Sequence, residues 1–228
     1  MGGAALGARV SGGPMPVVAG SLGVFGGTFD PIHFAHLAVA EEAAEVLGLE
    51  RVLFVPAGRP PHKPDRFITP AADRLAMIEL AIAGNDRFAV DRIELDREGP
   101  SYTVDTLEML ATRPSVGGSP ALTLLLSSEA FRDLPTWREP RRILELACLA
   151  VAPREGYPVV PTSFMDSEFA AFRDRVTYLD GPRMRLSASE LRARAAAGRT
   201  LRYLVPDAVA AYIDDHALYR NPRRNVAS

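Results

Sequence analysis

Short apolar runs alternate along the chain with longer segments in which apolar positions recur at a helical period. The strand-like runs cover residues 22–25, 52–55, 88–95, 121–126, 146–151 and 176–179. The run at 121–126, A-L-T-L-L-L, is apolar except for Thr123, as expected of a central parallel strand covered on both faces. The helical-period segments cover residues 34–49, 70–83 and 103–111. The last of these is predicted to open with Thr103 as its cap and Asp105 in its first turn.

Strands that alternate with helices of about 10–15 residues indicate βαβ units and a parallel sheet. The predicted fold class is therefore α/β, with a Rossmann-like open parallel sheet and helices on both faces. Residues 187–219 keep a helical pattern and contain no strand-like run. This last segment predicts a helical C-terminal extension of the same domain.

The pattern predicts one domain between two unstructured ends. Residues 1–20 are rich in Gly, Ala, Val and Pro, and Arg9 is their only charged side chain, which predicts a disordered lead-in. Residues 21–219 are predicted to form a single domain, with 187–219 as its helical C-terminal part, and residues 220–228 a disordered tail. No apolar run approaches the ~18 residues of a membrane span, so the sequence predicts no membrane partner.

Composition narrows the class of function. The 228 residues carry a net charge of −2, which gives no basic footprint and predicts no nucleic-acid partner. The one cysteine, Cys148, cannot form an internal disulfide, and its apolar neighbours predict a buried small side chain. A reducing, cytoplasmic location fits this cysteine usage. The oligomeric state is not readable, and a homo-oligomer stays open.

The stretch G-G-T-F-D-P-I-H-F-A-H, residues 26–36, stands where a strand should lead into a helix. Gly26 and Gly27 carry no Cβ, so the backbone there can turn sharply and approach a ligand closely. A helix that begins near residues 32–34 would present free N–H groups and its positive dipole end, which bind anions. His33 and His36, spaced i and i+3, would lie on one face of the first turn. Two imidazoles beside a helix N-terminus suit the oxygens of a polyphosphate.

Other interpretations of these histidines remain open at this point. The chain contains neither a Walker A loop nor G-x-G-x-x-G. An H-x-x-H metal site would need a third ligand, for which His62 is the nearby candidate. The two histidines could also lie on the surface of an ordinary loop.

The stretch resembles the G-G-x-F-D-P-x-H-x-G-H signature of the adenylyltransferase branch of the HxGH nucleotidyltransferases, with Ala35 in place of the signature's last glycine. Five further stretches, in the same order, resemble the bacterial nicotinate-nucleotide adenylyltransferases. They are P-A-G-R-P-P-H-K (56–63), G-P-S-Y-T-V-D-T-L (99–107), L-P-T-W (134–137), L-S-A-S-E-L-R (186–192) and Y-L-V-P-D-A-V-A-A-Y-I-D-D-H-A-L-Y (203–219). Together the resemblance covers about residues 21–219.

The resemblance implies an ATP site in three segments. The first is the glycine loop with its histidines. The second is the serine-arginine segment, in which Ser187 and Ser189 can cap a helix whose first turn includes Arg192. The third, Ser127-Ser128-Glu129, stands where the family has G-x-D. The implied ATP-binding residues are Gly26, Gly27, Thr28, Phe29, His33, His36, Ser127, Glu129, Ser187, Ser189 and Arg192.

The resemblance also implies a mononucleotide site. Trp137, the only tryptophan, would stack on the pyridine ring, and backbone N–H groups at Tyr102 and Thr103 would receive its carboxylate. Asp30 and Lys63 complete the implied set, and the implied catalytic residues are His33, His36, Lys63 and Arg192. From the residues alone, Trp137 and Tyr102 could equally pack in the core, and Lys63 could be a solvated surface lysine.

The implied reaction joins ATP and nicotinate mononucleotide into nicotinate adenine dinucleotide, with release of pyrophosphate, as a step of NAD biosynthesis. Mg²⁺ would accompany ATP, with mostly water and substrate ligands. Two alternatives remain open. The acceptor could be another phosphorylated molecule, such as nicotinamide mononucleotide or pantetheine phosphate, or the chain could bind nucleotides without catalysis.

Overall fold

A parallel sheet forms the centre of the protein. The computed structural model describes residues 9–10, 16–59, 68–114, 120–154 and 163–220. Within these residues the sheet has seven strands in the order β1-β7-β6-β5-β2-β3-β4, and every pairing is parallel. The strands are β1 (Arg9–Val10), β2 (Val18–Gly27), β3 (Leu49–Pro56), β4 (Phe88–Val90), β5 (Ala121–Ser127), β6 (Ala147–Ala152) and β7 (Val176–Leu179).

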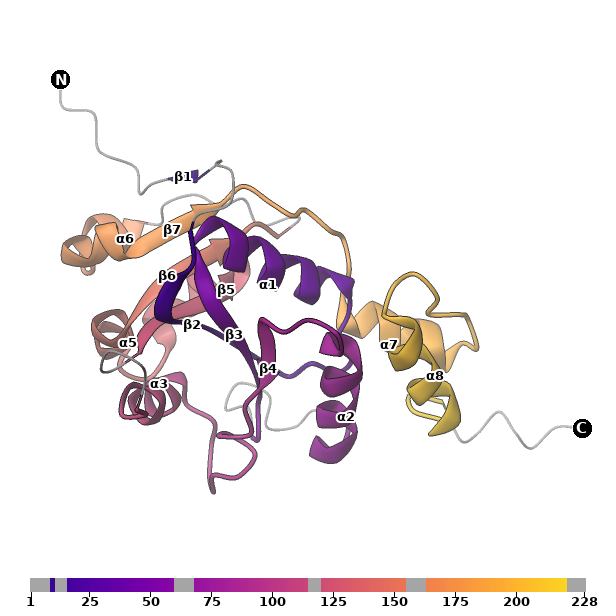
Figure 1. The fold of residues 1–228 in the computed structure, drawn as a ribbon. Coiled ribbons are helices and arrows are strands. Elements are labelled where there is room, and N and C mark those ends of the chain that lie inside the picture. The colour runs from indigo at the N-terminus through magenta and orange to yellow at the C-terminus, as the bar shows by residue number, and fades with distance from the viewer. Residues whose placement is uncertain (1–8, 11–15, 60–67, 115–119, 155–162, 221–228) are drawn as a thin grey trace, which may run out of the picture.

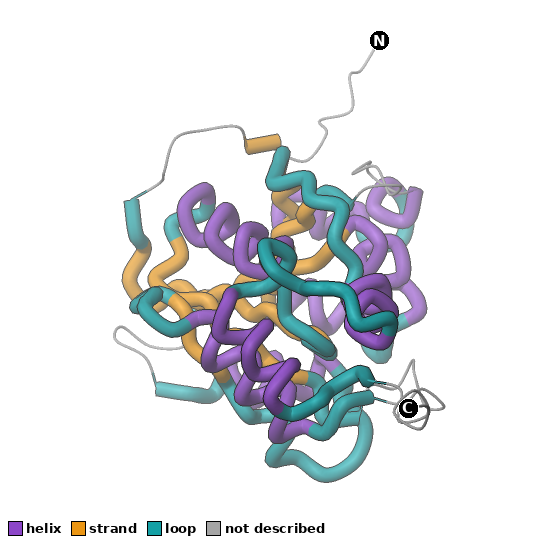
Figure 2. Tube along the Cα trace, turned by 90° about the vertical axis from the view of Figure 1, so that its right-hand side faces the viewer, coloured by secondary structure: helices purple, strands orange, loops and turns teal. Residues whose placement is uncertain are grey.

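Helices cover both faces of this sheet (Figures 1 and 2). On one face α1 (Phe34–Val46) and α2 (Ala71–Ile82) pack with α7 (Ala188–Ala196) and α8 (Asp207–Asp215) around one apolar cluster. On the other face lie α3 (Thr103–Ala111), α4 (Ser128–Asp133), α5 (Pro140–Leu146) and α6 (Ser163–Asp166), around a second cluster. Two 3-10 helices, η1 (Leu134–Thr136) and η2 (Ala170–Arg175), complete the described elements. The predicted fold class is confirmed.

The C-terminal helices α7 and α8 lie beside α2 rather than over the middle of the sheet (Figure 1). The Tyr212 hydroxyl of α8 donates a hydrogen bond of 2.8 Å to Asp73 Oδ1 of α2, which ties the extension to the sheet-bound layer. No helix in the described part of the chain is long and apolar enough to cross a membrane.

Several element boundaries differ from the sequence-based prediction. The first long helix ends at Val46, because Gly48 adopts a left-handed φ of 61° and Leu49 already begins β3. Of the strand-like run 88–95, only Phe88–Val90 pairs with β3. The short helices α4, α5 and α6 were not predicted, since each is under two full turns and too short to show a helical period.

Two predictions about the ends and the cysteine are corrected. Within the expected lead-in, Arg9–Val10 pairs with β7 and β2 begins at Val18, so part of residues 1–20 belongs to the sheet. Cys148 is exposed, not buried. It is the second residue of β6, and the alternation of side chains places it on the same face as Ala150, at the amino end of the strand.

The chain reverses its direction across the sheet between β2 and β5. From β2 it proceeds outward through β3 and β4, and then returns to the other side of β2 with β5, β6 and β7. At such a switch point the connections leave the two adjacent strands on opposite faces, which opens a crevice at their carboxyl ends. Gly27 ends β2 and Ser127 ends β5, so both sequence motifs lie at this point.

Candidate active site

The glycine loop that leaves β2 is shaped by Phe29. A Cβ at Gly27 would lie 3.1 Å from the ring of Phe29, which is tighter than most real contacts. A Cβ at Gly26 would meet nothing within 4 Å, and this residue is exposed. The left-handed backbone conformation in this loop belongs to Phe29, with φ of 49°, and not to either glycine. Gly26 therefore leaves open space for a ligand, whereas Gly27 makes room for the buried Phe29.

Arg74, a residue that the sequence analysis missed, holds the loop in place. It is 2% exposed, its Nε donates to the Thr69 carbonyl and its Nη1 to the Thr28 carbonyl, both at 2.9 Å. Burial lowers the pKa of Arg74, and the nearby Asp30 opposes that shift. The available signal in the sequence was an arginine within the amphipathic helical segment 70–83. Burying a charged side chain costs free energy unless it is paired or hydrogen-bonded, so such an arginine would need partners.

Asp30 is buried, and protein groups surround its carboxylate. Oδ1 accepts a 2.7 Å hydrogen bond from the Tyr219 hydroxyl, and Oδ2 accepts one of 3.3 Å from the Thr69 N–H. Arg192 Nη1 lies 4.0 Å from Oδ2 and donates to the Asp30 carbonyl at 2.6 Å. Burial and the Asp30 charge raise the pKa of Tyr219 above its usual value. In this structure Asp30 joins the loop to the C-terminal segment, and its contact with a mononucleotide stays a prediction.

The two histidines form a stacked pair at the start of α1. Their ring centroids are 3.7 Å apart with an interplanar angle of 22°. The backbone N–H of His33, the N-cap residue, donates to Nδ1 of His36 at 3.2 Å. A neutral His36 whose Nδ1 accepts this bond carries its proton on Nε2. His33 is 4% exposed, and its Nδ1 has no hydrogen-bond partner among the described residues. Buried polar atoms normally have a hydrogen-bond partner, so a polar ligand is the expected partner of this nitrogen.

Burial sets the charge state of this pair. It lowers the pKa of His33 to about 4, and the positive charge of Arg154 contributes in the same direction. Burial likewise lowers the pKa of His36 well below 6.5, assisted by His33 and Arg154. The ring of His36 also packs edge-on against Phe29, with centroids 5.1 Å apart. At neutral pH both imidazoles are therefore uncharged, and each supplies one N–H donor.

These lowered values predict a stability loss in mild acid. A histidine with a folded pKa near 4 and an unfolded pKa near 6.5 stabilises the fold fully above pH 6.5, and the contribution is lost as pH falls toward 4. For His33 this amounts to about 2 kcal/mol between pH 7 and pH 5. Urea unfolding at both pH values should therefore show a steeper loss in the wild type than in His33→Asn. Equal losses in the two proteins would contradict a neutral, buried His33.

The Ser-Ser-Glu segment after β5 has three separate contacts. Ser127 is the N-cap of α4, and its hydroxyl accepts a 3.2 Å hydrogen bond from the Ala130 N–H. The buried Ser128 accepts a 3.1 Å bond from the Arg154 N–H, which joins the ends of β5 and β6. Glu129 forms an ion pair with the Arg154 guanidinium.

Arg154 belongs to this site, although the sequence analysis did not select it. It follows β6 by two residues, and its charge acts on both histidines. The available signal was a basic residue directly after the carboxyl end of a strand beside the switch point. The family pattern has an aspartate at the position of Glu129. The longer glutamate side chain pairs here with Arg154, a cation of the same candidate site.

The serine-arginine segment meets the glycine loop from the C-terminal side. Ser187 is the N-cap of α7, but its side chain makes no capping hydrogen bond. Arg192 is the fifth residue of α7 and so lies in its second turn, not in the first as predicted. Its Nη2 donates to the Ser189 hydroxyl at 3.1 Å while its Nη1 holds the Asp30 carbonyl. The structure thus brings Arg192 and the glycine loop together.

Tyr102 and Trp137, which the resemblance implies for the pyridine ring, lie at the start of α3 and directly after η1. Both are partly buried against the apolar cluster on the α3 and α5 face. Tyr102, and not Thr103, is the N-cap residue of α3, and its N–H already donates to the Pro100 carbonyl at 3.1 Å. The first-turn N–H groups from Thr103 onward have no partner within the helix itself. Both aromatic residues therefore pack against the core and are only partly exposed.

Ser101 fixes the loop that precedes α3 against the loop after β3. Its hydroxyl accepts hydrogen bonds from the N–H groups of Gly58, at 2.9 Å, and Arg59, at 3.1 Å. A Cβ at Gly58 would lie 2.3 Å from the Glu94 carbonyl oxygen, so only glycine fits there. Burial raises the pKa of the Glu94 carboxyl, which accepts a 2.8 Å bond from the Thr106 hydroxyl.

The two glycines at Gly58 and Gly26 give a matched pair of substitutions. Gly58→Ala forces backbone apart and should lower the free energy of unfolding by about 2 kcal/mol. Gly26→Ala meets open space and should leave stability within about 0.5 kcal/mol. Urea unfolding of the two variants checks this, and equal stability losses would contradict the geometry at Gly58.

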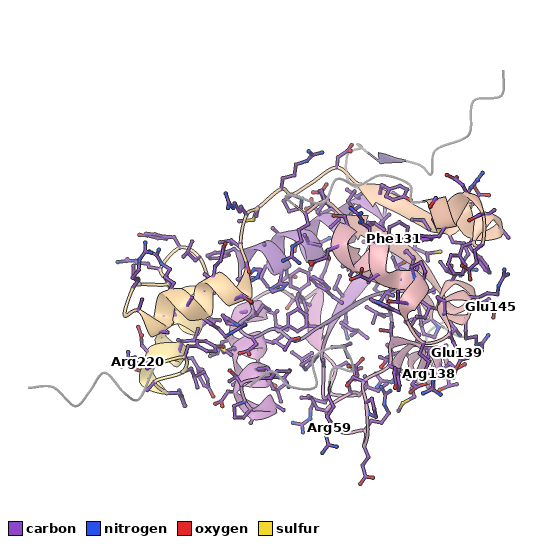
Figure 3. All side chains as sticks on the ribbon, turned by 180° about the vertical axis from the view of Figure 1, so that it is seen from behind. Arg59, Phe131, Arg138, Glu139, Glu145 and Arg220 are labelled. Atoms are coloured by element: carbon purple, nitrogen blue, oxygen red, sulfur yellow. The ribbon has the colours of Figure 1, made fainter. Side chains whose placement is uncertain are left out.

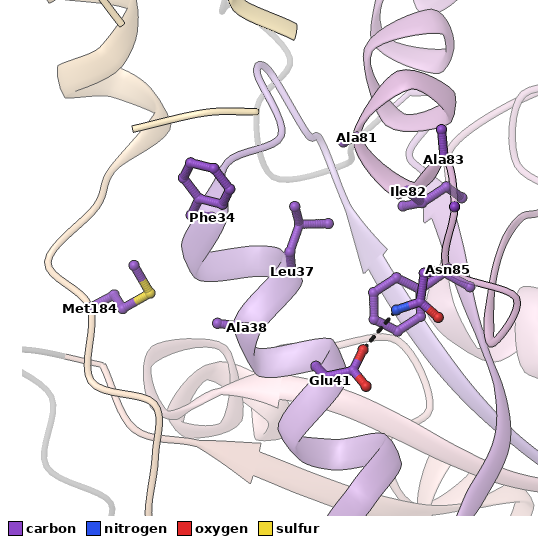
Figure 4. Close-up of a pocket in the computed structure, with 11 residues that line it drawn as sticks. Phe34, Leu37, Ala38, Glu41, Ala81, Ile82, Ala83, Asn85 and Met184 are labelled. Atoms are coloured by element: carbon purple, nitrogen blue, oxygen red, sulfur yellow. Dashed lines mark hydrogen bonds between the residues drawn. The ribbon is translucent and has the colours of Figure 1, made fainter. Parts of the chain in front are cut away.

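Two expected residues fall outside this account. Lys63 and His62 lie outside the described residues. In the part of the chain that the structure describes, no group of three or more His, Cys, Asp or Glu side chains could hold a metal ion. A separate cavity of about 510 Å³ lies between α1 and the end of α2, and Phe34, Leu37, Ile82, Phe88 and Met184 are among its lining residues (Figure 4). It contains none of the predicted site residues.

Comparisons with known proteins agree with this fold. The cytidylyltransferase-like family model matches residues 24–194. A protein of Thermomicrobium roseum named "Probable nicotinate-nucleotide adenylyltransferase" is 51% identical over 200 residues, 87% of this chain and 91% of its own. One of the same name from Corynebacterium kroppenstedtii is 43% identical, over 87% of this chain and 90% of its own.

Solved structures show the same fold. The nicotinic acid mononucleotide adenylyltransferase of Plasmodium falciparum complexed with NaAD has a TM-score of 0.66 at 17% identity, and the match covers 87% of this chain and 97% of that one. A second complex of that enzyme, with APC, has a TM-score of 0.65 at 16% identity, over 87% and 96% of the two chains.

The sheet, its switch point and the histidine-bearing loop define a nucleotidyltransferase. The chain belongs to the cytidylyltransferase-like family and, within it, to the nicotinate-nucleotide adenylyltransferases.

Proposed function

We propose that this protein transfers the adenylyl group of ATP to nicotinate mononucleotide, forming nicotinate adenine dinucleotide and pyrophosphate. One observation carries the proposal. At the switch point, two stacked and neutral histidines stand at the N-terminus of α1, and one of them has a buried nitrogen with no described partner. N–H donors at a helix N-terminus suit phosphate oxygens. The printed names of the curated relatives support the same activity.

The reaction needs positioning more than proton transfer. The 5′-phosphate of the mononucleotide is already an anionic nucleophile that attacks the α-phosphorus of ATP, while the bond to pyrophosphate breaks. Alignment and charge stabilisation dominate reactions of this type. The Nε2–H of His36 is positioned as a donor, because the His33 N–H fixes its other nitrogen as the acceptor. A neutral imidazole donates without giving up its proton, so no general base is required.

Cations at both sides of the loop would stabilise the leaving pyrophosphate. Arg192 is already oriented by the Asp30 carbonyl and Ser189, which lowers the cost of ordering it on a phosphate. Arg154 faces the histidines from the end of β6. Lys63 is proposed for the same role on the basis of the motif alone.

Mg²⁺ is the proposed divalent cation and would bind with ATP, neutralising part of the phosphate charge. Its ligands would be mostly phosphate oxygens and water. The chain's own contribution is the set of donors around the phosphates.

A side-by-side assay of acceptors tests the proposal. The protein is incubated with ATP, Mg²⁺ and one of three acceptors: nicotinate mononucleotide, nicotinamide mononucleotide or pantetheine phosphate. Formation of the adenylylated product of each acceptor is then followed by chromatography. We expect the highest kcat/KM with nicotinate mononucleotide. A higher value with either other acceptor would assign the site to that molecule, and no product with any of them would contradict adenylyl transfer.

A further inference from the structure

Arg138 lies between the two segments that would hold the pyridine ring. It directly follows Trp137, and its guanidinium carbon stands 4.8 Å from the centroid of the Tyr102 ring. Its side chain is 50% exposed, and Figure 3 shows it beside Glu139 at the surface. A cation stacked on an aromatic face keeps its orientation while its edge N–H groups stay accessible.

This position is not explained by the stability of the helix beneath it. Arg138 lies over the first turn of α3, since Tyr102 is the N-cap and Asp105 Oδ2 of the first turn is 3.8 Å from Nη1. The dipole of a helix disfavours a cation at its N-terminus. The ion pairs with Asp105, at 3.8 Å, and with Glu139, at 3.5 Å, are long and solvent-exposed, so they contribute little.

A ligand carboxylate at this turn would resolve the conflict. It could accept N–H bonds from the first turn of α3 and lie within a few ångströms of the Arg138 guanidinium. A carboxamide could accept the same N–H bonds through its carbonyl oxygen, but it carries no charge for the arginine to attract. The arginine therefore distinguishes acid from amide, while the backbone donors do not.

We propose that Arg138 is the specificity-determining residue that makes the acceptor site prefer the nicotinate ring over the nicotinamide ring. This inference rests on the proposed function of the site. It assigns a basic residue to the carboxylate, which the sequence motifs alone did not provide.

Binding of the mononucleotides, measured without catalysis, tests this role. Trp137 is the only tryptophan of the chain, so quenching of its fluorescence reports the dissociation constants of nicotinate and nicotinamide mononucleotide. In the wild type we expect the acid to bind about 5-fold more tightly, the upper end of the range for one partly exposed charge interaction. Arg138→Gln should remove most of this preference by weakening the acid, with the amide changed by less than about 2-fold. Arg138→Lys should keep part of the preference, because it keeps the charge.

Arg142 provides the matched control. It is an exposed arginine on α5 that pairs with Glu108 and Glu145. Arg142→Gln should leave the ratio of the two dissociation constants unchanged. An unchanged ratio in Arg138→Gln, an equal loss for both mononucleotides, or a wild type without preference would each overturn the role of Arg138. Failure of adenylyl transfer in the acceptor assay, with the binding preference intact, would instead overturn the proposed function.

Discussion

Replacing His36 by alanine is expected to lower turnover by at least about 100-fold, the scale of losing one positioned donor in the transition state. The substitution removes the Nε2–H donor and also the Nδ1 acceptor of the His33 N–H. Initial rates of pyrophosphate release at saturating substrates measure the effect. Turnover close to that of the wild type would remove His36 from the mechanism.

Two further substitutions separate the functions of the two ring nitrogens. In His36→Asn the side-chain oxygen can replace Nδ1 as the acceptor for the His33 N–H, but no donor remains near the position of Nε2. His36→Gln places an amide donor near Nε2 and loses the acceptor. If donation from Nε2 is what matters, the asparagine variant should be as slow as alanine and the glutamine variant faster. His216→Ala, at the end of α8, is the control and should leave turnover unchanged.

Replacing the buried Arg74 by methionine is expected to lower the free energy of unfolding by about 3 kcal/mol. Methionine fills much of the same volume but leaves the Thr69 and Thr28 carbonyls without their donor. It also leaves the buried Asp30 with one positive neighbour fewer. Denaturant unfolding measures the loss.

The same substitution should also affect catalysis, because Arg74 holds the backbone of the glycine loop at Thr28. We expect kcat/KM for ATP to fall by about 10-fold at a temperature where the variant remains folded, since small displacements of positioned groups are costly. Arg92→Met, which removes an exposed i, i+4 pair with Asp96, is the control and should leave both stability and kcat/KM near the wild type. Equal behaviour of the two variants would contradict the anchoring role of Arg74.

The fold could be predicted because its signals are local. The apolar runs at 121–126 and 176–179 correspond closely to β5 and β7, since buried parallel strands are apolar along their whole length. The strand prediction for residues 88–95 was too long. The alternation of apolar and polar residues continues after Val90, although the chain leaves the sheet there. The prediction for Cys148 was wrong because apolar neighbours in the sequence do not show whether a side chain is covered in the fold.

The candidate site could be predicted only in part. The glycine-histidine stretch is continuous in sequence and was found, and the order of the strands then placed it at the switch point. Arg74, Arg154 and Arg138 were missed, because each acts through a partner far away in sequence or across the sheet. Contacts of this kind follow from packing, which no single stretch of sequence encodes.

The segment Ser127-Ser128-Glu129, which differs from the G-x-D of the family, is a second case in which contacts could not be predicted from the sequence. The resemblance placed Ser127 among the implied ATP-binding residues, at a position where the family has glycine. In the structure it caps α4, and Ser128 joins the ends of β5 and β6. The departure thus has structural consequences that are compatible with an intact site.

The release of pyrophosphate from ATP tests the central claim most directly. The full chain is incubated with ATP and Mg²⁺, with and without nicotinate mononucleotide, and pyrophosphate and dinucleotide are both quantified. We expect pyrophosphate to appear only when the mononucleotide is present, and in an amount equal to that of nicotinate adenine dinucleotide. No pyrophosphate under these conditions, or pyrophosphate without dinucleotide, would contradict it.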